Sequence, residues 1–336
     1  IQTEAFGGNP MVLVPQVDAA VLWDRAGEIA DGDIVDDRPF DTAPLMLWFV
    51  ALTRAAGGGL AALGALQSVL LVATSIVLVR LTRTLAHASV GSDGSALEPA
   101  LSPDAVGLFA GAIFLLLQEP AAGTSRVLAG TLQLFVAALL LDALVRVDAS
   151  ASSGRVVRVG VLAGLAALAF PPFMGLVPVL AVWLWLRTGR DLWLPAAFVA
   201  ASGLAIAPAT VHNMVACGEP IPISAQAGLT FYHGNNPDAE GTFAASGVVN
   251  SKADQAPDSL ARARAGLEDE DAGWRDASRY WVRRGFDWWA TQPVRATEVA
   301  ATKLWYTLSG RRYGDVYQPW MEVRDGVASR LRLTFL

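Results

Sequence analysis

Long apolar segments separated by short polar stretches occupy most of this 336-residue chain. The first segment runs from 44 to 79 and carries a single charged residue, Arg54. Glycines at positions 57–59 divide it into a short helix and a span of about 20 residues, 60–79, which is the length that an α-helix needs to cross the hydrocarbon core of a bilayer. The pattern therefore predicts membrane-spanning helices.

Four more apolar segments follow the first. One of them, 159–186, is about 28 residues long, which is more than a single span needs, and Pro171 and Pro172 lie at its middle. Because proline breaks a helix interior and disfavours helix at the residue before it, we expect two short helices joined near these prolines. The other three segments are 104–117, 128–145 and 192–211.

Basic residues after these segments predict an orientation. The arginines cluster at 80/83, 146/155/158 and 187/190. Since short positively charged loops stay in the cytoplasm, all three clusters lie on the inner side if the chain turns back at Pro171 and Pro172. The stretch 1–43, the turn at Glu119, the proline turn and the stretch 212–284 are then expected on the outer side.

These patterns predict an all-α polytopic membrane protein with outer-face loops and juxtamembrane helices. Aromatic residues interleave with basic ones between Trp281 and Trp305, as is typical of a helix in the membrane interface or of a simple aromatic anchor. The predicted regions are 1–43, a first extracytoplasmic loop with an amphipathic helix; 44–211, a transmembrane helical bundle; 212–284, an extracytoplasmic loop; and 285–336, an interfacial helix.

The composition narrows the class further. Hydrophobic residues make up 53% of the chain, whereas soluble domains usually have about 45–50% with glycine included. A single cysteine excludes an internal disulfide and a cysteine-based zinc site, and three scattered histidines form no metal motif. Residues 1–43 carry nine Asp and Glu against two Arg, which argues against nucleic acid as a partner.

An acidic stretch, 17–44, precedes the first apolar segment. Asp18 is placed to cap a short helix with one apolar face, and Gly32 is placed to end that helix in a left-handed turn. A carboxylate at the outer rim of a membrane could instead take a proton from a substrate. Both explanations of Asp18 stay open at this point. The apolar face is formed by Leu22, Ala26, Ile29 and Ala30.

The order of residues in this stretch also carries a resemblance. Asp18 is followed by Trp-x-x-Ala-x-x-Ile-Ala-x-Gly-Asp over 23–33 and by Phe-x-x-Ala-Pro-Leu over 40–45. This order resembles the first extracytoplasmic loop of bacterial membrane glycosyltransferases of the C superfamily, relatives of the protein mannosyltransferases and the aminoarabinose transferase. The chain departs from the family at Met46 and Leu47, where the family usually has Tyr-Pro.

The resemblance implies an integral enzyme of the bacterial inner membrane whose active site faces the periplasm or exterior. Such an enzyme transfers a sugar, with inversion, from a polyprenyl-phosphate donor to a lipid, glycan or protein acceptor. It would contact membrane lipids and need no cofactor, while a divalent metal stays open. The resemblance also implies membrane helices before and after the given sequence, and it places Asp18 beside donor and acceptor.

Three acids are candidate catalytic residues. Asp18 is the first choice as a base, and Asp33 is a second that could be only a turn residue after Gly32. Glu119 is the third, because an acid at the end of an apolar span is costly unless it faces protein or water. Glu119 could also be an interfacial loop residue beside Pro120.

A second block lies near the start of the stretch 212–284. His212 and Asn213, followed by Gly234, Asn235 and Asn236, resemble the family's outer loop, in which a basic residue and Asn leave the span and a Gly-Asn-Asn turn follows. Turn amides can bind sugar hydroxyls, so these five residues are candidate substrate-binding groups. His212 could bind phosphate when protonated, or merely cap a helix C-terminus.

Two other functions stay open. A transporter would place ionisable residues inside its spans and show two repeated halves, whereas this sequence gathers its acids at the outer rim. A noncatalytic membrane scaffold would tolerate replacement of Asp18. Nucleotide-driven transport and serine hydrolysis are not supported, because no Walker loop, no dinucleotide-binding glycine motif and no Gly-x-Ser-x-Gly is present.

Overall fold

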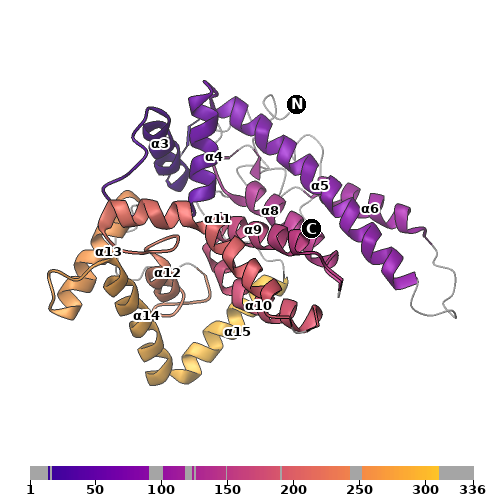
Figure 1. Cartoon of the computed structure of the whole chain (residues 1–336). Coiled ribbons are helices and arrows are strands. Elements are labelled where there is room, and N and C mark those ends of the chain that lie inside the picture. Colours follow the sequence, from indigo (N-terminus) through magenta and orange to yellow (C-terminus); the bar gives the residue numbers. More distant parts are fainter. Residues whose placement is uncertain are drawn as a thin grey trace. The chain divides into compact units, whose positions relative to one another are not determined.

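Helices make up all the regular secondary structure in the part of the chain that the computed structural model describes (Figure 1). The all-α class predicted from the sequence is therefore confirmed for these residues. The described residues are 14–15, 17–90, 101–117, 123–124, 126–148, 150–189, 191–242 and 252–309.

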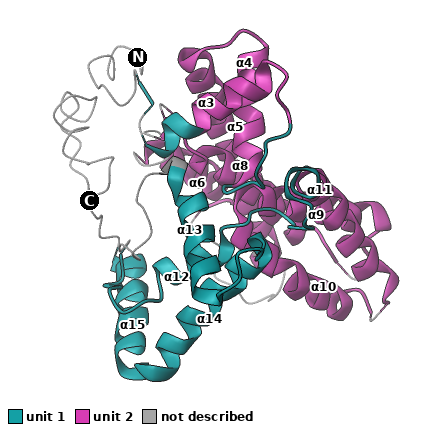
Figure 2. Cartoon of the chain, turned by 90° about the vertical axis from the view of Figure 1, so that its left-hand side faces the viewer, with its two compact units in different colours: residues 1–21, 35–42, 212–336 teal, residues 22–34, 43–211 magenta. Residues whose placement is uncertain are grey.

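The chain divides into two compact units, which Figure 2 shows in different colours. Unit 1 comprises 1–21, 35–42 and 212–336, and unit 2 comprises 22–34 and 43–211. Helix α3 (Asp18–Ala30) is divided between them, with its first four residues in unit 1 and the rest in unit 2.

Unit 2 is built mainly from apolar helices that glycine and proline separate. Helix α4 ends where Gly57 adopts a φ of 80°, and the N–H of Gly58 donates to the carbonyl of Thr53 at 2.9 Å. The expected break at 57–59 is therefore confirmed. The helices are α4 (Pro44–Ala55), α5 (Leu60–Val90), α6 (Pro103–Leu116), α8 (Gly130–Val145), α9 (Ser153–Ala169), α10 (Leu176–Arg187) and α11 (Trp193–Cys217), whose last six residues belong to unit 1.

The overlong apolar segment 159–186 is broken at its prolines. Helix α9 ends at Ala169, Phe170 is extended with φ −148° and ψ 97°, and a 3₁₀ turn over Pro171–Gly175 leads into α10. Gln133 Nε2 of α8 donates to the carbonyl of Ala169 at 2.9 Å, which satisfies one of the acceptors left at the end of α9. Two helices joined near the prolines were predicted, and the structure confirms them.

Helices α5 and α6 meet at two glycines of α6. A Cβ atom at Gly107 would lie 2.9 Å from the carbonyl oxygen of Val79, and one at Gly111 would lie 3.0 Å from Ser75 Oγ. Ser75 Oγ donates to the carbonyl of Gly111 at 3.0 Å across the helix pair. Glycines four residues apart thus let the two backbones approach, and the serine links them.

Helices α9 and α11 repeat this arrangement. A Cβ atom at Gly160 would lie 2.5 Å from the carbonyl oxygen of Phe198, and one at Gly164 would lie 2.6 Å from that of Ser202. Ser202 Oγ donates to the carbonyl of Gly160 at 3.0 Å. Both close helix pairs therefore use a Gly-x-x-x-Gly spacing and a serine hydroxyl that binds a glycine carbonyl.

Unit 1 contains a cluster of helices that follows the last apolar segment. Glu219, in the loop after α11, accepts hydrogen bonds from the backbone N–H groups of Trp274 at 2.7 Å and Arg275 at 2.9 Å, and so caps the start of α14. Gly228 allows α12 to contact the backbone of α14 at Ser278. The helices are α12 (Ala227–His233), α13 (Lys252–Leu267), α14 (Trp274–Thr291) and α15 (Pro293–Ser309).

The aromatic residues between Trp281 and Trp305 do not lie on a single helix. They lie on two helices, α14 and α15, which are separated before Pro293. Trp281 and Trp288 are only 3% and 4% exposed, whereas Trp305 is 63% exposed. Trp281 and Trp288 therefore do not anchor the helix with exposed rings, because the other helices of unit 1 cover the side of α14 on which both lie. The interfacial position of 285–336 stays a prediction.

Two of the described helices are long and apolar enough to cross a membrane, α5 over 60–89 and α11 over Trp193–Cys217. Four shorter apolar elements, each of 10–17 residues, accompany them. These are α4, α6, α8 and the segment 171–187, which includes α10.

Candidate functional site

Asp18 is the first residue of α3 and does not cap it. Val17, with a φ of 51°, precedes the helix, and its carbonyl accepts the N–H groups of Ala20 at 3.1 Å and Val21 at 3.2 Å. The capping role predicted for Asp18 is therefore wrong, because a backbone carbonyl already takes these donors. The Asp18 side chain is exposed and makes no hydrogen bond or ion pair with any residue that the structure describes. A carboxylate in the first turn still stabilises the helix through a favourable interaction with the helix dipole.

The C-terminal end of α3 forms the predicted left-handed turn. Gly32 has a φ of 108°, its N–H donates to Ile29 at 3.1 Å, and the N–H of Asp33 donates to Glu28 at 3.0 Å. These two bonds define a Schellman motif, so Asp33 is a turn residue. Its carboxylate lies 3.3 Å from Arg25 Nη1 in an exposed ion pair.

Arg54 attaches α3 to α4 within unit 2. Its Nη1 donates to the carbonyl of Trp23 at 2.6 Å, and its guanidinium carbon lies 4.7 Å from the centroid of the Trp23 ring. A Cβ atom on Gly27 would lie 2.6 Å from the same guanidinium, so a larger residue there would require the Arg54 side chain to move. Arg54, the single charged residue of the segment 44–79, therefore binds a residue of the acidic stretch 17–44, Trp23.

His212 lies inside α11, five residues before its end at Cys217, so it does not cap the C-terminus of that helix. Its ring stacks on Phe40 with centroids 3.9 Å apart and planes at 16°. The backbone N–H of Asp36 points to His212 Nε2 at 3.4 Å, and Nδ1 lies 3.3 Å from Asn213 Oδ1. An imidazole with its proton on Nδ1 satisfies both contacts. Within unit 1, His212 thus holds the segment 35–42 against the last residues of α11, 212–217.

Asn213 is completely buried and binds three backbone groups of unit 1. Its Oδ1 accepts the N–H of Phe40 at 2.8 Å, and its Nδ2 donates to Ile221 at 2.9 Å and to Ile223 at 3.1 Å. The carboxamide is therefore used inside the protein, where it ties two loops to the end of α11. In this arrangement it is not open to a substrate.

The turn over Gly234, Asn235 and Asn236 is also bound within unit 1. The N–H groups of Gly234 and Asn235 donate to carbonyls of the last turn of α12, at 3.2 and 2.9 Å. Lys303 Nζ donates to the carbonyl of Gly234, and Trp289 Nε1 donates to Asn235 Oδ1 at 2.9 Å. Asn236 is 1% exposed and binds only neighbouring backbone groups. The turn amides expected to bind sugar hydroxyls thus have partners in the chain.

The predicted site residues fall into separate groups. His212 and Asn213 touch each other, and the three residues of the turn follow one another in the same unit, whereas Asp33 belongs to unit 2. Glu119 lies outside the described residues. Among the residues that the structure describes, no three His, Cys, Asp or Glu side chains are arranged to hold a metal ion.

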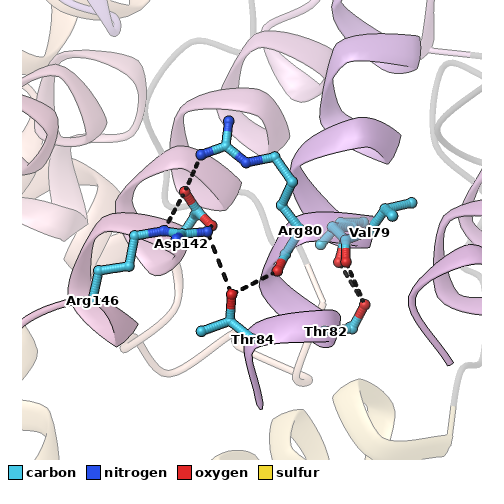
Figure 3. A network of polar contacts seen from close by, with 7 residues as sticks. Val79, Arg80, Thr82, Thr84, Asp142 and Arg146 are labelled. Carbon is cyan, nitrogen blue, oxygen red and sulfur yellow. Dashed lines mark hydrogen bonds and ion pairs between the residues drawn. The ribbon is translucent and has the colours of Figure 1, made fainter. Parts of the chain in front are cut away.

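A charged cluster that sequence reasoning missed lies between α5 and α8. Asp142, whose side chain is 3% exposed, is 2.7 Å from Arg146 Nη2 and 3.4 Å from Arg80 Nη2 (Figure 3). Arg146 Nη2 also donates to Thr84 Oγ1 at 3.4 Å. The i,i+4 spacing of Asp142 and Arg146 was visible in the sequence and is typical of an ion pair on one helix face. Two arginines therefore neutralise a buried acid one turn from the end of α8.

Comparison of the chain with protein-family models, with curated proteins and with solved structures finds no match. The resemblance to membrane glycosyltransferases therefore stays an expectation from the order of residues around Asp18 and in the second block.

Proposed function

We propose that this chain is part of an integral membrane glycosyltransferase of the C superfamily, working on the outer face of a bacterial inner membrane. It transfers a sugar from a polyprenyl-phosphate donor to a lipid, glycan or protein acceptor. The observation that carries the catalytic part of the proposal is the state of Asp18, an exposed carboxylate at the start of α3 with no partner among the described residues. Asp33, by contrast, is ion-paired with Arg25.

The distribution of polar and apolar side chains on α5 supports the membrane part of the proposal. Gln67, Thr74 and Ser75 are 1–5% exposed, whereas Val69 and Ile76 are 64% and 56% exposed. A helix that turns its polar groups inward and its apolar groups outward suits a hydrocarbon solvent, since a soluble protein rarely exposes large continuous apolar patches. Similar exposed rows lie on α6 and α10, at Leu108, Phe109, Ile113, Leu116, Leu176, Val179, Val182 and Leu186.

The close helix pairs give a second line of support. Between helices in lipid, apolar burial supplies little driving force, so association relies on close backbone approach and on hydrogen bonds. The glycine pairs of α6 and α9 and the hydroxyls of Ser75 and Ser202 provide both.

Sugar transfer requires a group that removes the acceptor proton, and an accessible carboxylate can do this. We therefore expect Asp18→Asn to lower transfer about 10²–10⁴-fold, the usual contribution of a positioned base. Its free energy of unfolding should change by less than about 1 kcal/mol, because only the favourable charge near the helix N-terminus is lost. Glu119→Gln is expected to lower transfer less than Asp18→Asn does.

The assay uses membranes that contain the full chain, radiolabelled polyprenyl-phosphate sugars, and detection of label in lipid, glycan and protein. Asp33→Asn is the matched control, since it removes a carboxylate from the other end of α3, and its transfer should stay within about twofold of the wild type. Full transfer by Asp18→Asn would remove the catalytic assignment and favour a noncatalytic scaffold.

The buried acid of α8, Asp142, does not have the surroundings expected of a transport site. Asp142 lies close to the helix end at Arg146, and Arg80 and Arg146 both bind it. Transport sites require ionisable groups that change partners near the middle of the membrane, whereas this cluster is paired at a helix terminus.

A further inference from the structure

A hollow of about 410 Å³ lies in unit 2 at the N-terminal end of α8. Leu134 and Ala137 of α8 line it together with Phe170 and Phe173, which flank the proline break. The two phenylalanine rings meet edge to face, with centroids 5.4 Å apart. Gly123, four residues after Glu119 in the sequence, also lines the hollow. Residues that follow the proposed outer turn at Glu119 and residues of the proline break, which the arginine pattern also predicts on the outer side, therefore meet at one apolar recess.

Hydrogen-bond donors lie at one end of this recess. Helix α8 begins at Gly130, and the residue before it, Ala129, has no side chain that could cap the helix. The N–H groups of a first helical turn lack acceptors within their helix, and their dipoles favour a negative charge. Thr131 lines the hollow, is 2% exposed, and its hydroxyl has no hydrogen-bond partner within the described residues.

These features call for a ligand with an acceptor-rich, negatively charged end and an apolar body. Buried polar groups in proteins are nearly always hydrogen-bonded, so a buried hydroxyl without a partner beside a hollow points to a missing acceptor. No charged side chain is among the described residues that line the recess, so the positive potential there comes from the helix terminus.

We propose that this recess binds the phosphate end of a membrane lipid. Its phosphate oxygens accept hydrogen bonds from the Thr131 hydroxyl and from the first-turn N–H groups of α8, and its first carbons lie against Leu134, Ala137 and Phe170. The identity of the lipid as a polyprenyl phosphate rests on the proposed function. The hydrogen bonds and apolar contacts that bind the phosphate end do not depend on it.

The test measures binding of dodecyl phosphate to the full chain in nanodiscs by the shift in thermal unfolding, with dodecanol and inorganic phosphate as separate ligands. We expect saturable stabilisation by dodecyl phosphate and much weaker effects of the other two. Thr131→Val should raise the dissociation constant about tenfold or more, as loss of a hydrogen bond to a charged group does, while Thr131→Ser stays within about threefold.

Thr74→Val is the matched control, because Thr74 is also 2% exposed on a helix of unit 2 but its hydroxyl donates to Leu70 at 2.7 Å. Thr74→Val should leave dodecyl phosphate binding unchanged. Ala137→Trp places a large side chain in the recess and should abolish binding, which keeps the proposal testable if Thr131→Val fails to fold. Equal binding by the wild type and Thr131→Val, or by the wild type and Ala137→Trp, would overturn the proposal.

The sugar-transfer assay distinguishes this result from failure of the proposed function. Binding of dodecyl phosphate that depends on Thr131, in a chain that transfers no sugar, would retain the lipid-phosphate site and overturn glycosyl transfer. Transfer of sugar without such binding would overturn the lipid-phosphate site alone.

Discussion

At the scale of single residues, several polar side chains that suggested substrate binding are held by backbone groups instead. Asn213 is completely buried with three hydrogen bonds to backbone groups, and Asn236 is 1% exposed. A buried carboxamide has two donors and an acceptor that must all find partners, so it organises loops effectively. Asparagine beside glycine in a sequence therefore indicates a turn more firmly than it indicates a sugar site.

Lys303 carries a prediction at this scale, because burial lowers the pKa of its amino group below the usual 10.5. Its Nζ donates to the carbonyl of Gly234. The unfolded chain then binds more protons than the folded chain at pH values just below 10.5, so folding stability should rise with pH in that window.

The measurement compares thermal unfolding of the wild type and Lys303→Met between about pH 8 and pH 10.5, the upper limit being the ordinary pKa of lysine. The stability of the wild type relative to the variant should increase with pH. A decrease over the same range would mean that the protonated amine is the form that the fold favours.

At the scale of elements, packing decides what an amphipathic pattern means. Trp281 and Trp288, seven residues apart on α14, lie on its covered side, and Trp281 packs against Leu229 and Tyr232. The same aromatic and basic residues, read along the chain, are also typical of a helix in the membrane interface. The sequence pattern defines the apolar face but not whether lipid or protein covers it.

Gly160 provides a prediction at this scale. Replacement of a helix-interior glycine by alanine ordinarily stabilises a helix by up to about 1 kcal/mol. At Gly160 the new Cβ atom would lie 2.5 Å from the carbonyl oxygen of Phe198. At Gly203 on α11 the new Cβ atom would have no neighbour within 4 Å apart from its chain neighbours and the nearby backbone of its own helix. Gly160→Ala should therefore lower the unfolding temperature in detergent.

Gly203→Ala is the matched control and should leave the unfolding temperature unchanged or raise it. If both variants behave alike, α9 and α11 do not approach each other as closely as described. If Ser202→Ala lowers the unfolding temperature as Gly160→Ala does, the loss of stability comes from the contact between these two helices.

At the scale of the whole molecule, the proposed membrane orientation carries a prediction. In a background with Cys217→Ala, cysteines introduced at positions 36 and 250 should react with an impermeant thiol reagent in intact cells, and one at 152 should react only after permeabilisation. The reason is the arginine pattern, which assigns the clusters at 80/83, 146/155/158 and 187/190 to the cytoplasm. Labelling at 152 in intact cells would reverse the orientation and separate Asp18 from the outer face.

The sequence by itself determined the all-α class and three breaks between helices, because these breaks depend on local backbone chemistry. The turn at Gly32, the break at 57–59 and the break at Pro171 all follow from conformations that glycine allows or proline imposes, and each appears where it was expected. Only the tertiary structure decided which polar side chains are already bound. The contacts of Asn213 with Phe40 and of Asp142 with Arg80 join residues distant in the chain. Hydropathy and spacing along the chain cannot reveal such contacts, nor that the buried Thr131 hydroxyl has no partner among the described residues.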